Sequence, residues 1–158
     1  MLKLYKGKTA NVKTVRKLET RLGIALSDPF RKFVFSNDGA IPEANKFIGN
    51  EELGCGVDAF ISVEEIWHEK SLLNNLNQLA YPIAWAAGGN YIVIDPNSKN
   101  EVFFWDHEVE NSLTYLAENF DEFLKNLVAF DLKILEDSPR KVISGWVDPD
   151  FLKSLKVH

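Results

Sequence analysis

The sequence predicts a single α+β domain in which a largely antiparallel sheet with a central meander is flanked by N-terminal helices and a C-terminal helix. Three observations support this fold class. Apolar residues recur every three or four positions toward both ends of the chain, which indicates amphipathic helices. Aromatic and β-branched residues concentrate between these helices, in runs separated by turn residues. The chain has 158 residues, of which 46% are hydrophobic and 12% aromatic, enough for one core. We therefore expect one domain over residues 1–158.

Two helices are expected in the first 40 residues. The first has apolar positions at helical spacing, at Val12, Val15, Leu18 and Leu22. Asn11 can cap its start, and Gly23 can end it. The second helix follows Ser27, whose hydroxyl is expected to cap it, with Pro29 suited to its first turn. The Asn-Asp-Gly sequence at residues 37–39 supplies the turn that ends this helix.

The next segment is expected to be mostly irregular. Residues 40–50 contain turn-forming pairs, so we expect a loop there with a short strand near Phe47. Ser62 and Glu65 have the spacing of a capping box, in which each side chain satisfies a free backbone amide at a helix start. This spacing predicts a short helix over residues 63–70.

The strongest strand signals lie in residues 81–95 and 101–107. Turn residues at 87–90 and 96–100 divide these segments into three strands, which predicts the antiparallel meander. The two glycines of the first turn precede a strand, so they suit a tight hairpin and not a phosphate-binding loop, which would open a helix. The side chains expected to pack against helices are Trp85, Ile92, Ile94, Phe103 and Trp105.

A last helix is expected after Asn119, which can cap it. Its apolar face is expected to contain Phe120, Phe123, Leu124, Leu127 and Val128. Residues 129–158 still carry large apolar side chains such as Trp146 and Phe151. We therefore expect them to form a packed C-terminal extension of the domain.

The sequence is typical of a cytoplasmic protein that does not enter the membrane. No apolar run approaches the ~20 residues that cross a bilayer, and no secretory signal is apparent at the N-terminus. Cys55 is the single cysteine, so the chain cannot form an internal disulfide or a zinc site with two thiolates. A reducing compartment fits this composition.

Charge is distributed unevenly along the chain. Residues 1–32 carry nine Lys or Arg against two Asp or Glu, whereas residues 33–130 carry four against sixteen. Residues 131–158 are balanced, and the whole chain has a formal charge of −5. An acidic middle repels a phosphate backbone and attracts a basic partner, although it can also serve only as a solubilising surface.

The basic N-terminal region is the one feature that suggests nucleic acid. Helical spacing places Lys13, Lys17 and Arg21 on one face, where they could contact phosphates. No aromatic stacking motif or recognised reading helix accompanies this row. We therefore favour a solvated helix face over a nucleic-acid site.

The sequence contains no recognisable catalytic or metal-binding constellation. Cys55 has no evident histidine partner that would activate it as a nucleophile. His68, His107 and His158 lack the spacing of metal ligands on a common helix face. His107 lies between Asp106 and Glu108, but neighbours on a strand point to opposite faces and cannot share a site. We expect no catalytic residue, no metal and no cofactor.

Three stretches, taken in order, resemble the SUKH superfamily, which includes the yeast Smi and Knr cell-wall regulators. Residues 26–39 resemble its early helix and Asn-Gly turn, residues 82–95 its central hairpin, and residues 116–124 the start of its C-terminal helix. The resemblance covers about residues 10–128, with departures at Ser27, Asp38 and Asn90, where a proline, a glycine and an acidic residue are usual. It implies an α+β fold.

The resemblance also implies a protein partner. Bacterial members of the superfamily are typically immunity proteins that bind a toxin, often a nuclease, encoded beside them. The alternatives are a Smi/Knr-like regulatory scaffold without a toxin and, less favoured, a small enzyme or a nucleic-acid binder. We expect a monomer or weak homodimer.

The partner-binding residues are expected among the acidic side chains of the middle segment. The first candidates follow the third strand, at Asp106, Glu108 and Glu110. The second group comprises Glu51, Glu52, Glu64 and Glu65. The alternative interpretation of both groups is ordinary solvated charge.

Overall fold

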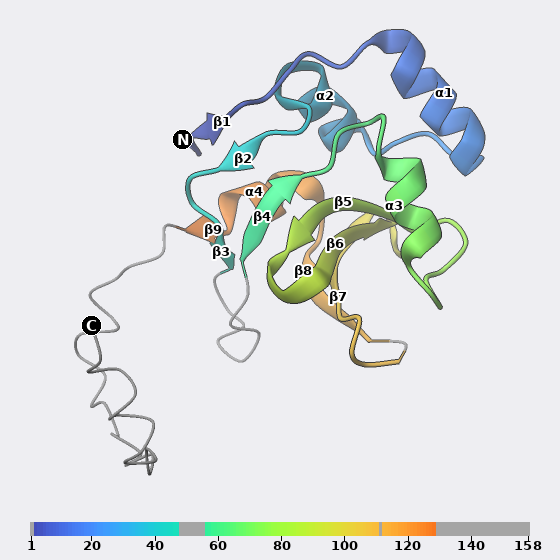
Figure 1. Cartoon of the computed structure of the whole chain (residues 1–158), viewed down its shortest axis with the longest axis vertical. Helices are drawn as coiled ribbons and strands as arrows, with labels where there is room; N and C mark the ends of the chain where they lie inside the picture. Colours follow the sequence, from blue (N-terminus) through green and yellow to red (C-terminus); the bar gives the residue numbers. More distant parts are fainter. Residues whose placement is uncertain (1, 48–55, 111, 129–158) are drawn as a thin grey trace, which may run out of the picture.

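The protein is built around a five-stranded antiparallel sheet with the strand order β4-β5-β6-β7-β8 (Figure 1). A computed structural model describes residues 2–47, 56–110 and 112–128. The strands are β4 (Val57–Phe60), β5 (Tyr81–Ala86), β6 (Asn90–Asp95), β7 (Glu101–Trp105) and β8 (Leu113–Ala117). The α+β class and the central meander, β5 to β7, are therefore confirmed. The third strand ends at Trp105 and not at residue 107, and β4 and β8 extend the meander on either side.

The meander turns use the residues that the sequence indicates. Gly88 and Gly89 have φ angles of 80° and 84°, which a residue without Cβ adopts freely. They lie in a single 3₁₀ turn, Ala87–Gly89, directly between β5 and β6. A second 3₁₀ turn, Pro96–Ser98, joins β6 to β7. The hairpin interpretation of both segments is confirmed.

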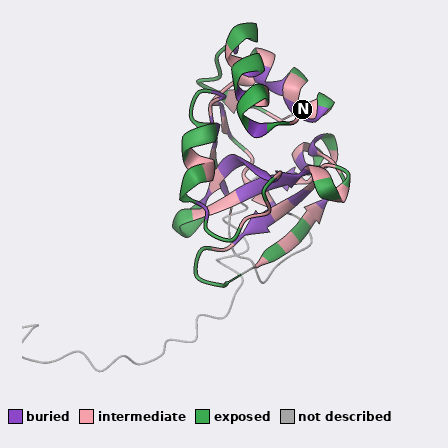
Figure 2. Ribbon diagram, turned by 90° about the vertical axis from the view of Figure 1, so that its right-hand side faces the viewer, coloured by how far each residue is buried: buried purple, intermediate pink, exposed green. Residues whose placement is uncertain are grey.

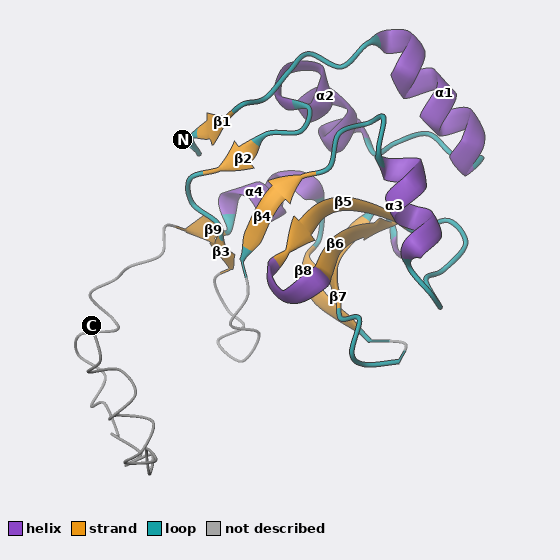
Figure 3. Cartoon of the chain, in the orientation of Figure 1, coloured by secondary structure: helices purple, strands orange, loops and turns teal. Residues whose placement is uncertain are grey.

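The described part of the chain contains four helices (Figure 3): α1 (Val12–Leu22), α2 (Asp28–Asn37), α3 (Ile66–Leu72) and α4 (Phe120–Lys125). Asn11 caps α1, since its Oδ1 accepts a hydrogen bond from the Lys13 amide at 2.8 Å. Gly23 ends α1 in the left-handed conformation, with φ of 72°. Asn119 caps α4. These local predictions are confirmed.

The cap expected at Ser27 does not form. Ser27 is the residue before α2, but its side chain makes no capping hydrogen bond. Its backbone amide instead donates to the Tyr81 hydroxyl at 3.1 Å, which ties the start of α2 to β5. Burial raises the pKa of this phenol. A contact between residues far apart in sequence thus fixes the start of α2, although it does not bond the amides that a Ser27 cap would satisfy.

The start of α3 also differs from the prediction. The Ser62 hydroxyl donates to the Glu65 carboxylate at 2.9 Å, so the two side chains bond each other and not the helix amides. The helix proper begins at Ile66. The Val63 amide is satisfied by the Asp38 carboxylate at 2.8 Å, from the turn that follows α2.

Two further pairs of strands, each strand only two residues long, lie outside the five-stranded sheet. β1 (Leu4–Tyr5) pairs with β2 (Ile41–Pro42), and β3 (Lys46–Phe47) pairs with β9 (Leu127–Val128), both antiparallel. The strand expected near Phe47 is confirmed. Leu127 and Val128 were expected on a helix face, but α4 ends before them. Their backbone pairs with β3, and Leu127 is buried there.

The main core lies between α1, α2 and α4 and one face of the sheet. Ile92, Ile94 and Phe104 point into it from the strands, as the alternation of a pleated sheet requires. An aromatic cluster fills its centre, with members Phe30, Phe33, Phe60, Phe120 and Phe123. Trp85 packs against this core while partly exposed.

The other face of the sheet is only partly covered. Val93 and Trp105 form a small second core with Leu73, and Phe103 packs against it while partly exposed. Phe103 and Trp105, which were expected to pack against helices, therefore lie on the face opposite Ile92 and Ile94, because their side chains alternate with that of Phe104 along β7. Leu73, which directly follows α3, packs against them, and Leu72 at the end of α3 lines a hollow with Trp105.

The two edges of the sheet differ in cover. The chain around β2 and β3 borders β4, where the Phe60 amide donates to the Ala40 carbonyl at 2.8 Å. At the other edge, no strand within the described residues pairs with the outer side of β8. Along β8 exposed and half-buried residues alternate, as the burial colours of Figure 2 illustrate for the strands.

None of the described helices has the length and apolar character needed to cross a membrane. The extension expected over residues 129–158 lies outside the described residues.

Candidate protein-interaction surface

The first group of predicted acidic residues lies in the loop between β7 and β8. Glu108 and Glu110 are exposed and Asp106 is half-buried. The Asp106 carboxylate accepts a hydrogen bond from the Glu108 amide at 2.9 Å, which forms a local turn. None of the three forms an ion pair with Lys or Arg within the described ranges. Their charge is therefore available to a partner.

A side chain from β6 holds this loop in place. The Asn90 Oδ1 accepts a hydrogen bond from the His107 amide at 3.1 Å and lies 2.8 Å from His107 Nδ1. Because an amide oxygen only accepts, this contact requires the His107 proton to be on Nδ1. The other ring nitrogen faces Glu108 Oε1 at 4.0 Å. The start of the β7–β8 loop is thus fixed to β6 of the meander.

Exposed apolar side chains accompany these carboxylates. Tyr115 and Leu113 on β8 are 52% and 39% exposed, and Val109 in the loop is 54% exposed. The Tyr115 ring meets Phe103 of β7 edge-to-face, with 6.1 Å between centroids. Val109 and Glu110 also line a hollow of about 450 Å³ that reaches Leu72 at the end of α3. Exposed apolar groups beside charges are typical of protein-binding surfaces.

Leu113 and Tyr115 were not predicted as surface candidates, because the sequence does not indicate the strand β8 that presents them. The only signal was the period-two alternation of Leu113, Tyr115 and Ala117, which is short and interrupted by Leu116.

Further carboxylates surround Tyr115. Partial desolvation raises the pKa of its phenol, and the charges of Glu122, Glu101 and Glu118 raise it further. We call the combined surface the acidic face. It comprises Glu101, Asp106, Glu108, Glu110, Glu118 and Glu122 around the apolar residues Val109, Leu113 and Tyr115.

The second predicted group is only partly described and lies elsewhere. Glu64 and Glu65 are exposed in the turn before α3. Burial raises the pKa of the nearby Asp38, and the charges of Glu64 and Glu65 raise it further. Glu64 lines a hollow between α1 and α3, whereas Glu108 and Glu110 line the hollow beside Leu72. Glu51 and Glu52 lie outside the described residues, as does Cys55.

The described residues contain no group of three or more His, Cys, Asp or Glu side chains placed to hold a metal ion. Several polar side chains cap helices or hold turns, as Asn11, Asn119 and Asp106 do.

A comparison with protein families identifies the fold. The family model SUKH_6, described as SMI1-KNR4 cell-wall, matches residues 13–124, more than half of the chain. The chain belongs to the SUKH superfamily. The SUKH match begins in α1 and ends in α4, so the whole five-stranded sheet and the acidic face lie within it. No curated protein matched the sequence.

Proposed function

We propose that this SUKH domain is a non-enzymatic binding protein that neutralises a cognate toxin by direct contact, as an immunity protein in the cytoplasm. The proposal is based mainly on one observation. On the acidic face, Tyr115, Leu113 and Val109 are exposed among carboxylates that form no ion pairs with Lys or Arg in the described residues. Apolar anchors can supply affinity on binding, while the carboxylates attract and orient a basic partner.

The partner that fits this surface is a basic toxin domain, with a nuclease as the leading class. A nuclease binds its substrate through cations that contact phosphates. Carboxylates on a surface loop can form ion pairs with those cations and so prevent the nucleic-acid substrate from binding. Glu108 and Glu110 are suited to this role because they project from a loop that Asn90 anchors at its start.

The second candidate is a Smi/Knr-like regulatory scaffold that has no toxin partner. It is favoured by the family description, which refers to the cell wall. Gene context distinguishes the two functions. A toxin gene beside this one supports immunity, whereas its absence together with a wall or growth defect on deletion supports regulation.

Co-expression tests the immunity function directly. The toxin domain encoded beside the gene is induced in a host with and without this protein, and growth is followed. We expect the wild type to restore growth and Tyr115→Ser combined with Glu110→Lys to lose protection while remaining folded. Arg16→Gln, an exposed change on α1, serves as the control. Full protection by the double variant would exclude the acidic face as the binding surface.

A further inference from the structure

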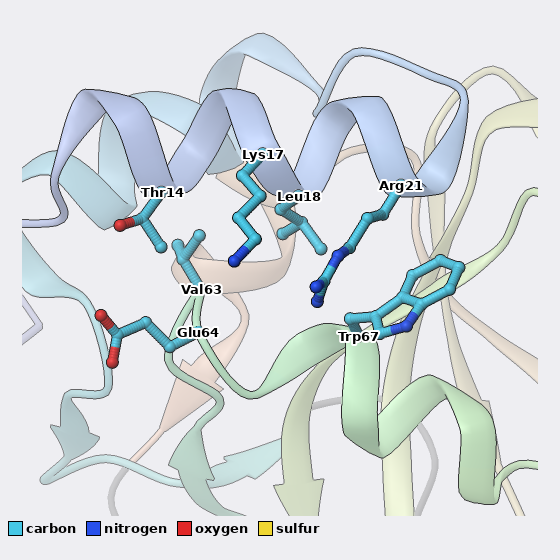
Figure 4. A pocket seen from close by; sticks show the side chains of 7 residues that line it. All are labelled: Thr14, Lys17, Leu18, Arg21, Val63, Glu64 and Trp67. Carbon is cyan, nitrogen blue, oxygen red and sulfur yellow. The ribbon is translucent and has the colours of Figure 1, made fainter.

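A second hollow lies between α1 and α3, and it differs from the acidic face in charge. Its volume is about 260 Å³ (Figure 4). Leu18 of α1 and Val63 before α3 form an apolar base, since they are only 3% and 2% exposed. Thr14 and Glu64 complete one end of the hollow.

Two cations enter this hollow from the same helix. Lys17 and Arg21 lie one turn apart on α1, and both side chains extend toward α3 (Figure 4). Neither forms an ion pair within the part of the chain that the structure describes. Like charges one turn apart repel each other slightly, so a bound anion would relieve this repulsion.

An aromatic wall faces the cations. Trp67 of α3 is 40% exposed, and the Arg21 guanidinium carbon lies 6.0 Å from the centroid of its ring. This distance is at the outer limit of a cation–π contact. Because Trp67 is 40% exposed, part of its side chain remains accessible to a partner. Exposed tryptophan and arginine are the residues most often dominant in protein interfaces.

We propose that this hollow binds an acidic segment of a protein partner that carries an aromatic residue. One carboxylate would lie between Lys17 and Arg21, where both cations can donate charge-assisted hydrogen bonds. The adjoining aromatic side chain would lie on Trp67, above Leu18 and Val63. This site goes beyond the proposed function, because a basic toxin held on the acidic face needs no cationic pocket.

Size and charge favour a protein segment over other ligands. The hollow is smaller than a typical small-molecule pocket of about 300–1,000 Å³, so it suits one or two side chains. Glu64 lines the same hollow, and Glu65 and Asp38 lie beside it. Glu64 lies at the Thr14 end of the hollow, away from Arg21 and Trp67 (Figure 4). A single acidic side chain can therefore approach Arg21 and Lys17 from the other end, whereas a continuous phosphate backbone would also meet these carboxylates.

Nuclear magnetic resonance can test the proposal on the full chain. The protein is labelled with ¹⁵N, and the Trp67 indole signal is assigned from its loss in Trp67→Phe. The probe is the peptide acetyl-Gly-Asp-Phe-Asp-Gly-amide, and the comparison ligands are the same peptide with lysine in place of aspartate and an oligothymidylate. We expect saturable shifts of the Trp67 indole with a Kd on the order of 1 mM, weakened by added salt.

Matched variants locate the binding groups. Lys17→Gln combined with Arg21→Gln should weaken the acidic peptide at least about tenfold, because two charge-assisted hydrogen bonds are lost. Arg16→Gln removes an exposed cation from a part of α1 that does not line the hollow, and it should leave the affinity within about twofold. The amide spectra establish that each variant is folded.

Three results would overturn the proposal. The first is an absence of shifts at Trp67 with the acidic peptide, or equal shifts with the lysine peptide. The second is an equal loss of affinity in Arg16→Gln. The third is tighter binding of the oligothymidylate than of the acidic peptide, which would assign the hollow to nucleic acid instead.

Discussion

The Glu69 carboxylate joins α3 to β5 and β6. Its Oε2 accepts hydrogen bonds from Trp85 Nε1 at 3.1 Å and from the Tyr91 hydroxyl at 2.6 Å. Burial raises the pKa of Tyr91 to about 12, and the hydrogen bond and charge of Glu69 contribute to the rise. The protonated phenol is therefore the form that the folded protein prefers.

This preference has a defined pH dependence. The stability that Tyr91 contributes is fully present below its ordinary pKa near 10 and is lost as the pH rises toward about 12. We expect Glu69→Gln to move the pKa of Tyr91 back toward 10, since the neutral amide removes the negative charge. Titration of the tyrosine ¹³Cζ signals measures this shift. Tyr115, whose raised pKa does not depend on Glu69, is the internal control. An unchanged Tyr91 titration in Glu69→Gln would contradict the contribution assigned to Glu69 and leave burial as the cause of the raised pKa.

The helix caps give a second test at the level of single residues. Asn119 Oδ1 accepts a hydrogen bond from the Glu122 amide at 3.0 Å, whereas the Ser62 hydroxyl bonds only the Glu65 side chain among its described contacts. We expect Asn119→Ala to lower the free energy of unfolding by about 1 kcal/mol. Ser62→Ala should lower it by less than about 0.5 kcal/mol. Urea denaturation compares the two variants, and equal losses would show that the Ser62 box caps α3 after all.

Local sequence was sufficient for some of these residue roles and not for others. Asn11, Gly23 and Asn119 act on amides or carbonyls a few residues away, so their spacing predicts their roles. Ser27 has equally suitable spacing, but its amide bonds Tyr81, which is 54 positions later in the chain. The sequence around Ser27 cannot indicate a hydrogen-bond partner at that separation.

At the level of elements, α4 anchors the sheet through its aromatic face. Phe123 is fully buried, and its ring lies 5.2 Å from that of Phe47 and 6.0 Å from that of Phe120. The helix therefore connects the main core to the β3–β9 pair.

Removing this side chain should leave a cavity in the core. We expect Phe123→Ala to reduce the free energy of unfolding by about 3–5 kcal/mol. Lys125→Ala, an exposed change in the last turn of the same helix, should cost less than about 1 kcal/mol. Thermal and urea unfolding provide the measurement. A melting temperature unchanged by Phe123→Ala would show that this face of α4 does not pack as described.

The sequence predicts the longer elements better than the short ones. The meander strands and α1 have enough periodic residues to be recognised alone. β1, β2, β3 and β9 are two residues long, and their strand character arises from pairing across the fold. Leu127 continues the helical spacing of Phe120 and Phe123, yet pairing with Phe47 draws it into β9. The second core of Leu73, Val93 and Trp105 could not be predicted either, because it arises from contacts between residues of separate elements.

For the whole molecule, the unequal charge of the sequence becomes two surfaces of opposite sign. Carboxylates surround β8 and the β7–β8 loop, while α1 carries Lys13, Arg16, Lys17 and Arg21. The sequence alone predicts the acidic excess and the first carboxylates of the acidic face. It does not predict Tyr115 and Leu113 among them, nor Trp67 beside the basic row of α1, because these neighbours come from separate elements.

We propose that the acidic face steers a basic toxin onto this domain. Asp106→Asn, Glu108→Gln and Glu110→Gln together should leave the melting temperature within a few degrees, since Glu108 and Glu110 are exposed and none of the three pairs with a described Lys or Arg. Glu64→Gln combined with Glu65→Gln is the comparison variant, because it removes exposed carboxylates that lie outside the acidic face.

The most direct measurement is the association rate with the cognate toxin domain, followed by stopped flow from low salt to several hundred millimolar. We expect the triple variant to associate at least several-fold more slowly than the wild type at low salt, and the difference to shrink as salt screens the charges. The comparison variant should stay close to the wild type. An association rate that responds neither to the triple substitution nor to salt would contradict electrostatic steering by the acidic face.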